Sequence, residues 1–169
     1  MMNQKHGNIG LTRRHCVGLG IASVAAAPAW AAQLAPEPPA RVALGGFDAV
    51  SYFLGGQNSP ETGLAAFEYS WSGRTWRFAH PANREAFRAE PAIYAPRLGG
   101  FDPLGVIEGR FVNTDPLIFL LVPGPDGSRL YLFRSTANRA AFAADADLPG
   151  QAEARWPDLR RSPDADPAE

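Results

Sequence analysis

The feature that most constrains the fold of this 169-residue chain is an internal repeat. Residues 44–48 (Leu-Gly-Gly-Phe-Asp) recur unchanged at 98–102. A second pattern, Phe-x-x-x-Ala-Asn-Arg-x-Ala-Phe-x-Ala followed by an acid, fills 78–90 and recurs at 133–145. Because both patterns recur in the same order and at almost the same separation, we interpret the sequence as a duplication of one small unit of structure. The two repeat units are expected at 44–90 and 98–145.

Each repeat unit predicts the same elements in the same order: a short helix, a β-hairpin and a second helix. Gly-Gly predicts a tight turn, after which Asp48 or Asp102 is placed to cap the short helix. Aromatic and polar residues alternate through 67–78 around a Ser-Gly-Arg turn, whereas 117–122 is continuously apolar. The first hairpin should therefore be half exposed and the second buried on both faces. The expected fold class is α+β, one small domain at 44–156 with a pseudo-two-fold relation between its halves.

The second helix of each unit begins at a recognisable cap. Pro81 opens the first of these helices with His80 at the cap position, and Ser135 or Thr136 caps the equivalent helix. A last short helix is expected at 151–155, ending before the next proline.

The first 31 residues are organised as an export signal. Basic residues at positions 5, 13 and 14 precede a weakly apolar run at 16–27, and Ala-Trp-Ala at 29–31 offers a cleavage site. The adjacent arginines predict the twin-arginine route, hence a periplasmic or exported protein. The apolar run is too short to span a bilayer, so no transmembrane segment is expected in the mature protein. A Pro-rich spacer at 32–43 and a disordered tail at 157–169 complete the predicted boundaries.

Loss of residues 1–31 would limit the chemistry open to the mature chain. Three positive charges and no negative ones leave, so the formal net charge falls from -1 to -4, which disfavours nucleic acid as a partner. The only cysteine, both methionines and the only lysine leave as well, and His80 becomes the only histidine. Such a chain has no thiolate nucleophile, soft-metal site or Schiff-base lysine, and we expect no cofactor.

Five side chains are candidates for ligand binding or catalysis, and each also has a structural interpretation. His80 could be a ligand or a base, or only a partly exposed capping residue. Asp48 and Asp102 could form an acid/base pair or a hard-cation site, or could simply cap helices. Arg84 and Arg139 could cradle an anion, or could form buried ion pairs with the two aspartates.

The motifs together resemble the YHS domain family, in particular its exported stand-alone bacterial members. The resemblance covers roughly residues 44–159. It rests on Gly-Phe-Asp-Ala-Val-Ser-Tyr-Phe at 46–53, the pattern at 78–87, Pro91 with Tyr-Ala-Pro at 94–96, Gly-Gly-Phe at 99–101, Leu-Pro-Gly at 148–150 and Trp-Pro at 156–157.

Metal-binding members of that family have cysteines at positions that correspond here to Ser51, Ala79 and Asn83. Exported members similar to this chain often have a further cysteine where this chain has Asp102. The resemblance therefore supports the fold, while the missing thiols argue against the heavy-metal role that it would imply. We expect Asn83 and Asn138 to tie helix to hairpin through hydrogen bonds to backbone, in place of a metal.

The leading functional expectation is an exported binding or accessory domain for an unknown small ligand or periplasmic protein. One alternative is a periplasmic metal-handling protein that uses His80, Asp102 and other oxygen ligands. A hydrolase-type enzyme is a further alternative, disfavoured because no nucleophile, base and orienting group can be assembled around one histidine.

Overall fold

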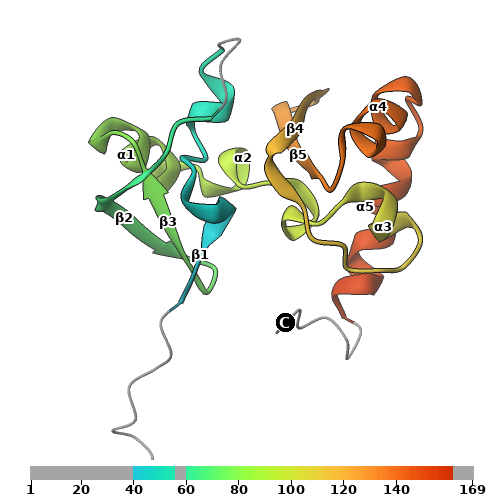
Figure 1. Cartoon of the computed structure of the whole chain (residues 1–169), viewed down its shortest axis with the longest axis horizontal. Helices are drawn as coiled ribbons and strands as arrows, with labels where there is room; N and C mark the ends of the chain where they lie inside the picture. The colour runs from blue at the N-terminus through green and yellow to red at the C-terminus, as the bar shows by residue number, and fades with distance from the viewer. Residues whose placement is uncertain (1–39, 56–59, 162–169) are drawn as a thin grey trace, which may run out of the picture. The chain divides into compact units, whose positions relative to one another are not determined.

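The described part of the chain, residues 40–55 and 60–161 of a computed structural model, contains five α-helices, two small sheets and three short 3-10 helices (Figure 1). The 3-10 helices are Ala43–Gly46, Ser51–Phe53 and Arg97–Gly100. The described residues belong to one compact unit of mixed α+β structure. The predicted export signal, most of the predicted spacer and the end of the predicted tail lie outside these residues. No helix in the described ranges is long and apolar enough to cross a membrane.

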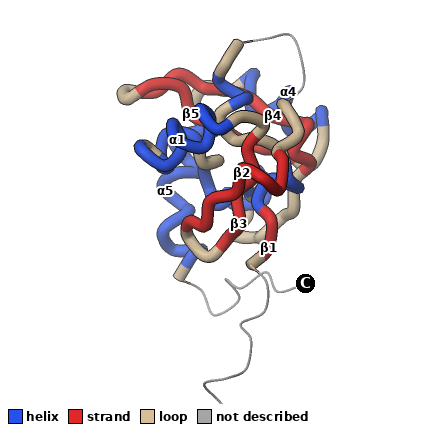
Figure 2. The backbone as a smooth tube through the Cα atoms, turned by 90° about the vertical axis from the view of Figure 1, so that its left-hand side faces the viewer, coloured by secondary structure: helices blue, strands red, loops and turns tan. Residues whose placement is uncertain are grey.

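The first sheet has three strands in the order β1-β3-β2 (Figure 2). β2 (Leu64–Trp71) and β3 (Arg74–Phe78) form an antiparallel hairpin, and β1 (Arg41–Val42) runs parallel to β3. Exposed and half-buried residues alternate along the second half of β2, so the half-exposed first hairpin is confirmed. The fold begins earlier than the predicted spacer boundary at 43, because β1 pairs with β3 and Ala43 is buried.

The second sheet is the hairpin of β4 (Asp115–Gly124) and β5 (Gly127–Phe133), and it packs on both faces. Leu130 and Leu132 belong to one hydrophobic core, whereas the neighbouring Tyr131 and Phe133 belong to a second. Successive residues of a strand point to opposite faces, so this hairpin separates the two cores. The prediction of a hairpin buried on both faces is confirmed for residues 130–133 of β5 and only in part for β4, whose residues are half-buried or exposed.

Each core gathers around a phenylalanine of the helix that follows its hairpin. Phe87 lies 4.6 Å from Trp76 and 5.2 Å from Phe78 between ring centroids, in the first core. Phe142 lies 5.1 Å from Tyr131, in the second. Six aromatic residues are buried or partly buried in the first core: Tyr52, Phe53, Trp71, Trp76, Phe78 and Tyr94.

The helix that follows each hairpin begins where the sequence predicted. α1 (Pro81–Ala89) has His80 as its N-cap residue, without a side-chain capping bond. α4 (Thr136–Ala144) is capped by Ser135, whose Oγ accepts from the Asn138 amide at 3.1 Å. Two shorter helices lie between them: α2 (Pro91–Tyr94) and α3 (Pro103–Ile107).

The last helix is longer than predicted. α5 (Leu148–Arg160) replaces the short helix expected at 151–155 and continues through Pro157 into the segment expected to be a disordered tail. Proline removes one backbone donor from a helix, which is why the sequence predicted a stop. Leu159, only 8% exposed and part of the second core, compensates for the lost hydrogen bond by holding the last turn against the fold.

Both Leu-Gly-Gly sequences form tight turns with three consecutive left-handed residues. The φ angles are 53°, 59° and 93° for residues 44–46, and 55°, 63° and 87° for residues 98–100. Glycine adopts this region freely, whereas a leucine there costs about 1–2 kcal/mol. Leu44 and Leu98 are 8% and 2% exposed, so the burial of their side chains offsets that cost.

Candidate functional site

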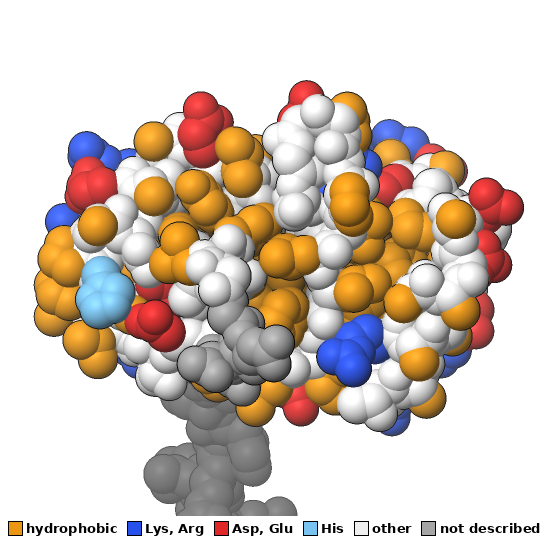
Figure 3. All heavy atoms as spheres, turned by 90° about the horizontal axis from the view of Figure 1, so that it is seen from above, with side chains coloured by type: hydrophobic (Ala, Val, Ile, Leu, Met, Phe, Trp, Pro, Cys, Tyr) orange, Lys and Arg blue, Asp and Glu red, His pale blue; other side chains and the backbone are white. Residues whose placement is uncertain are grey.

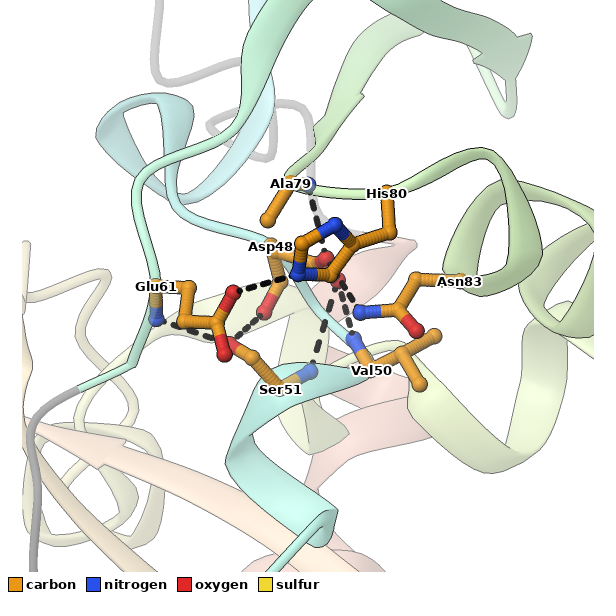
Figure 4. Close-up of polar contacts among 7 residues, drawn as sticks. All are labelled: Asp48, Val50, Ser51, Glu61, Ala79, His80 and Asn83. Atoms are coloured by element: carbon orange, nitrogen blue, oxygen red, sulfur yellow. Dashed lines mark hydrogen bonds and ion pairs between the residues drawn. The ribbon is translucent and has the colours of Figure 1, made fainter.

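Asp48 is the centre of the polar cluster in the first half of the chain, drawn in Figure 4. Its side chain is fully buried and accepts four hydrogen bonds, all from N–H groups. Oδ1 accepts from the backbone amides of Val50 (2.8 Å) and Ser51 (3.3 Å). Oδ2 accepts from the backbone amide of Ala79 (2.8 Å) and from Nδ2 of Asn83 (2.7 Å). We call these five residues the Asp48 cluster; it joins the turn, the end of the first hairpin and α1.

Asp102 has corresponding surroundings in the second half. It is also fully buried, and its Oδ1 accepts from the backbone amides of Leu104 (3.0 Å) and Gly105 (3.4 Å). Its Oδ2 accepts from the backbone amide of Arg134 (2.7 Å) and from Nδ2 of Asn138 (3.0 Å). We call these five residues the Asp102 cluster. The predicted capping role of Asp102 is confirmed, since its side chain caps α3.

These contacts leave neither aspartate available for acid/base chemistry. An ionised carboxylate has about four acceptor positions, and in both clusters all are used. Neither carboxylate is exposed to a substrate. In the described structure Asp48 and Asp102 lie in separate clusters and make no hydrogen bond to each other, so the sequence-based idea of a carboxylate pair gains no support.

Two of the expected partnerships are wrong. Arg84 pairs with its exposed neighbour Glu85 at 3.1 Å rather than with an aspartate, and Arg139 is an exposed residue of α4. Asn83 and Asn138 bind the aspartate carboxylates rather than backbone. In each half the aspartate therefore binds the asparagine of the Asn-Arg pair and not the arginine that follows it. The sequence alone does not show which of two adjacent side chains points inward.

His80 lies on the surface, where the histidine is visible in pale blue beside an acidic side chain (Figure 3). Its side chain is 63% exposed, and Nε2 lies 3.2 Å from Oε2 of Glu61. Ser51 is close by, but its Oγ donates to the Asp48 carbonyl at 2.6 Å and accepts from the Glu61 amide at 2.9 Å (Figure 4). A serine nucleophile must give its proton to a base, and here the proton is directed at a backbone carbonyl. The three residues therefore do not form a hydrolase triad.

The residues proposed for a metal are not brought together. His80 lies before α1 with Glu61 as its partner, while Asp102 is enclosed at the start of α3. Among residues 40–55 and 60–161, no group of three or more His, Cys, Asp or Glu side chains is arranged to hold a metal ion.

A third polar cluster was not predicted from the sequence. Arg97 donates to both carboxylate oxygens of Glu153, each at 2.7 Å, and the Tyr131 hydroxyl donates to the same carboxylate at 2.8 Å. Burial would raise the pKa of Glu153, but the hydrogen bonds from Arg97 and Tyr131 and the guanidinium charge outweigh it and lower that pKa. Burial, followed by the bond to Glu153, raises the pKa of Tyr131 to about 12. These residues lie outside the repeated motifs, so no pattern marked them.

A groove of about 800 Å³ is bordered by both Leu-Gly-Gly turns and by this third cluster. Tryptophan and arginine are frequent in its lining, and Glu153 is the one acidic side chain among the described residues that line it. The tryptophans and arginines are Trp71, Trp76, Trp156, Arg41, Arg74, Arg97 and Arg160. The groove is within the size range of small-molecule sites.

Comparison with protein-family models, with curated proteins and with solved structures gives no match to this chain in any of the three.

Proposed function

We propose that this chain is an exported, YHS-like binding domain in which a buried, fully hydrogen-bonded aspartate replaces the family's thiolate metal site. The proposal extends to its architecture: two duplicated helix–hairpin–helix units related by a pseudo-two-fold. Its role would be to bind a small ligand or a periplasmic protein rather than to catalyse a reaction.

The observation that supports the proposal most directly is the identity of the donors to Asp48. The three positions that correspond to family cysteines are Ser51, Ala79 and Asn83, and each provides an N–H that points at the Asp48 carboxylate. A cation needs lone pairs directed at it, whereas this arrangement directs protons inward and is complementary to an anion. The residues therefore do not fit a metal at this point.

The fourth corresponding position supports the same conclusion. Asp102, where exported members often have a cysteine, is enclosed by its own four N–H donors. The correspondence of the two clusters, donor by donor, also favours the duplication. Both aspartates hold a turn, a hairpin end and a helix together, which is the work that a structural metal does in small domains.

Metal content tests the proposal. The exported protein, purified from its own host without chelators, should contain well below one equivalent of any transition metal. Equilibrium dialysis against Zn²⁺ and Cd²⁺ should give no stoichiometric uptake. One bound metal per chain that is lost in Asp48→Ala or Asn83→Ala would overturn it.

A further inference from the structure

The groove between the two Leu-Gly-Gly turns concentrates the tryptophans of the described chain. Trp71, Trp76 and Trp156 all line it, and the remaining tryptophan, Trp30, belongs to the predicted export signal. Trp71 and Trp76 meet edge to face with ring centroids 5.8 Å apart, and because Trp76 is only 5% exposed, Trp71 is the indole of this pair that a ligand could reach. Gly99 lets Trp156 approach the turn, because a Cβ at this position would lie 3.1 Å from the indole. The groove thus offers two half-buried indoles, Trp71 from the first half of the fold and Trp156 from the second.

The same groove concentrates positive charge in a chain whose formal net charge is -1. Four arginines line it against Glu153, whose charge is already neutralised by Arg97. Arg74 and Arg160 are exposed and have no ion pair with any residue of the described ranges. Guanidinium groups that face a groove without a carboxylate partner suit an anionic ligand.

One wall of the groove is fixed in position. The two 2.7 Å bonds from Arg97 to Glu153, and the bond from Tyr131, tie the turn at 97–100 to α5 and β5. Residues held in this way lose little conformational entropy when a ligand binds, which increases affinity.

We infer that this groove binds a small organic anion with a flat apolar body. Its carboxylate or phosphate groups would pair with Arg74 and Arg160, and its ring would lie against Trp71 or Trp156. The inference rests on the proposed role as a binding domain, and adds the place and the ligand class.

Tryptophan fluorescence gives a direct test, because every tryptophan of the chain after residue 31 lines the groove. The processed protein would be titrated at low salt with benzene-1,3,5-tricarboxylate, with phenyl phosphate and with the neutral benzene-1,3,5-trimethanol. At least one anion should bind with a dissociation constant below about 1 mM. The tighter of the two identifies the preferred acid group. Arg74→Gln/Arg160→Gln should weaken binding about tenfold or more.

The matched control is Arg88→Gln/Arg139→Gln, which removes the same charge from exposed helix positions outside the groove. It should leave the dissociation constant within about twofold of the unaltered protein. The inference is overturned if neither anion binds, if the neutral triol binds as tightly, or if the control weakens binding as much as the groove variant. None of these results bears on metal content, so a failure here is distinct from a failure of the proposed aspartate-for-metal replacement.

Discussion

Replacing Asp48 by asparagine tests the Asp48 cluster with almost no change in volume. Oδ1 accepts from Val50 and Ser51, and Oδ2 accepts from Ala79 and Asn83. Whichever oxygen becomes an NH₂ group, two donors lose their acceptor and face another donor. The substitution therefore cannot be relieved by flipping the amide.

The expected cost follows from those two donors. A buried donor left without a partner costs about 1–3 kcal/mol, so the loss of two acceptors in Asp48→Asn should lower the free energy of unfolding by about 2–6 kcal/mol. Domains of this size have about 5–15 kcal/mol in total, so the variant should be folded but severely weakened. Asp102→Asn should cost about as much, because its contacts correspond.

Urea unfolding followed by far-UV circular dichroism measures this cost, and an unchanged m-value shows that the unfolding transition itself is the same. Asp126→Asn, at an exposed position in the turn between β4 and β5, is the control and should change stability by less than about 0.5 kcal/mol. If the free energy of unfolding of Asp48→Asn also stays within about 0.5 kcal/mol of that of the unaltered protein, the four hydrogen bonds to the Asp48 carboxylate do not stabilise the fold as proposed.

Three further results are expected. Gly99→Ala would place a Cβ in a left-handed backbone position and 3.1 Å from the Trp156 indole, whereas Gly73→Ala has the backbone strain alone, because nothing lies within 4 Å of its Cβ. Thermal unfolding should therefore show a larger fall in Tm for Gly99→Ala than for Gly73→Ala. Leu159→Ala should lower the free energy of unfolding in urea by about 2–4 kcal/mol, because it opens a cavity beneath the end of α5. A change near zero would show that the end of α5 is not packed on the second core. The lowered pKa of Glu153 stabilises the fold above pH 4.5, and this stabilisation is lost as pH falls through the folded pKa, so Glu153→Gln should flatten the acid side of a stability–pH profile. The raised pKa of Tyr131 stabilises the fold below pH 10, and this stabilisation is lost as pH rises toward 12, so Tyr131→Phe should flatten the alkaline side. Profiles of the two variants that keep the slopes of the unaltered protein would contradict this.

The sequence predicted the two hairpins, their different burial and the starts of α1 and α4, because alternation and capping are local properties. It also identified Asp48, Asn83 and Asn138 as structural residues, whereas Asp102, which it kept as a ligand-binding candidate, is a buried cap. It assigned the aspartates to the wrong partners, since a repeat shows which residues recur together but not which of two adjacent side chains points inward.

The remaining differences have tertiary causes. Pro157 predicted a helix stop, and only the packing of Leu159 on the second core explains why α5 continues. The groove joins residues from both halves, and the bond from Arg97 to Glu153 spans 56 positions of sequence. Neither the groove nor this bond produces a periodic or local sequence pattern, so neither could be predicted from the sequence.

The most direct test of the central claim, that buried aspartates replace a metal, is the unfolding midpoint of the exported protein with and without a chelator. We expect the same midpoint in both conditions. We also expect Asn83→Ala and Asn138→Ala each to lower the midpoint by the same amount with and without the chelator. If the midpoint of the unaltered protein falls when the chelator is added and recovers when Zn²⁺ or another metal is restored, a metal and not the buried aspartates stabilises the fold.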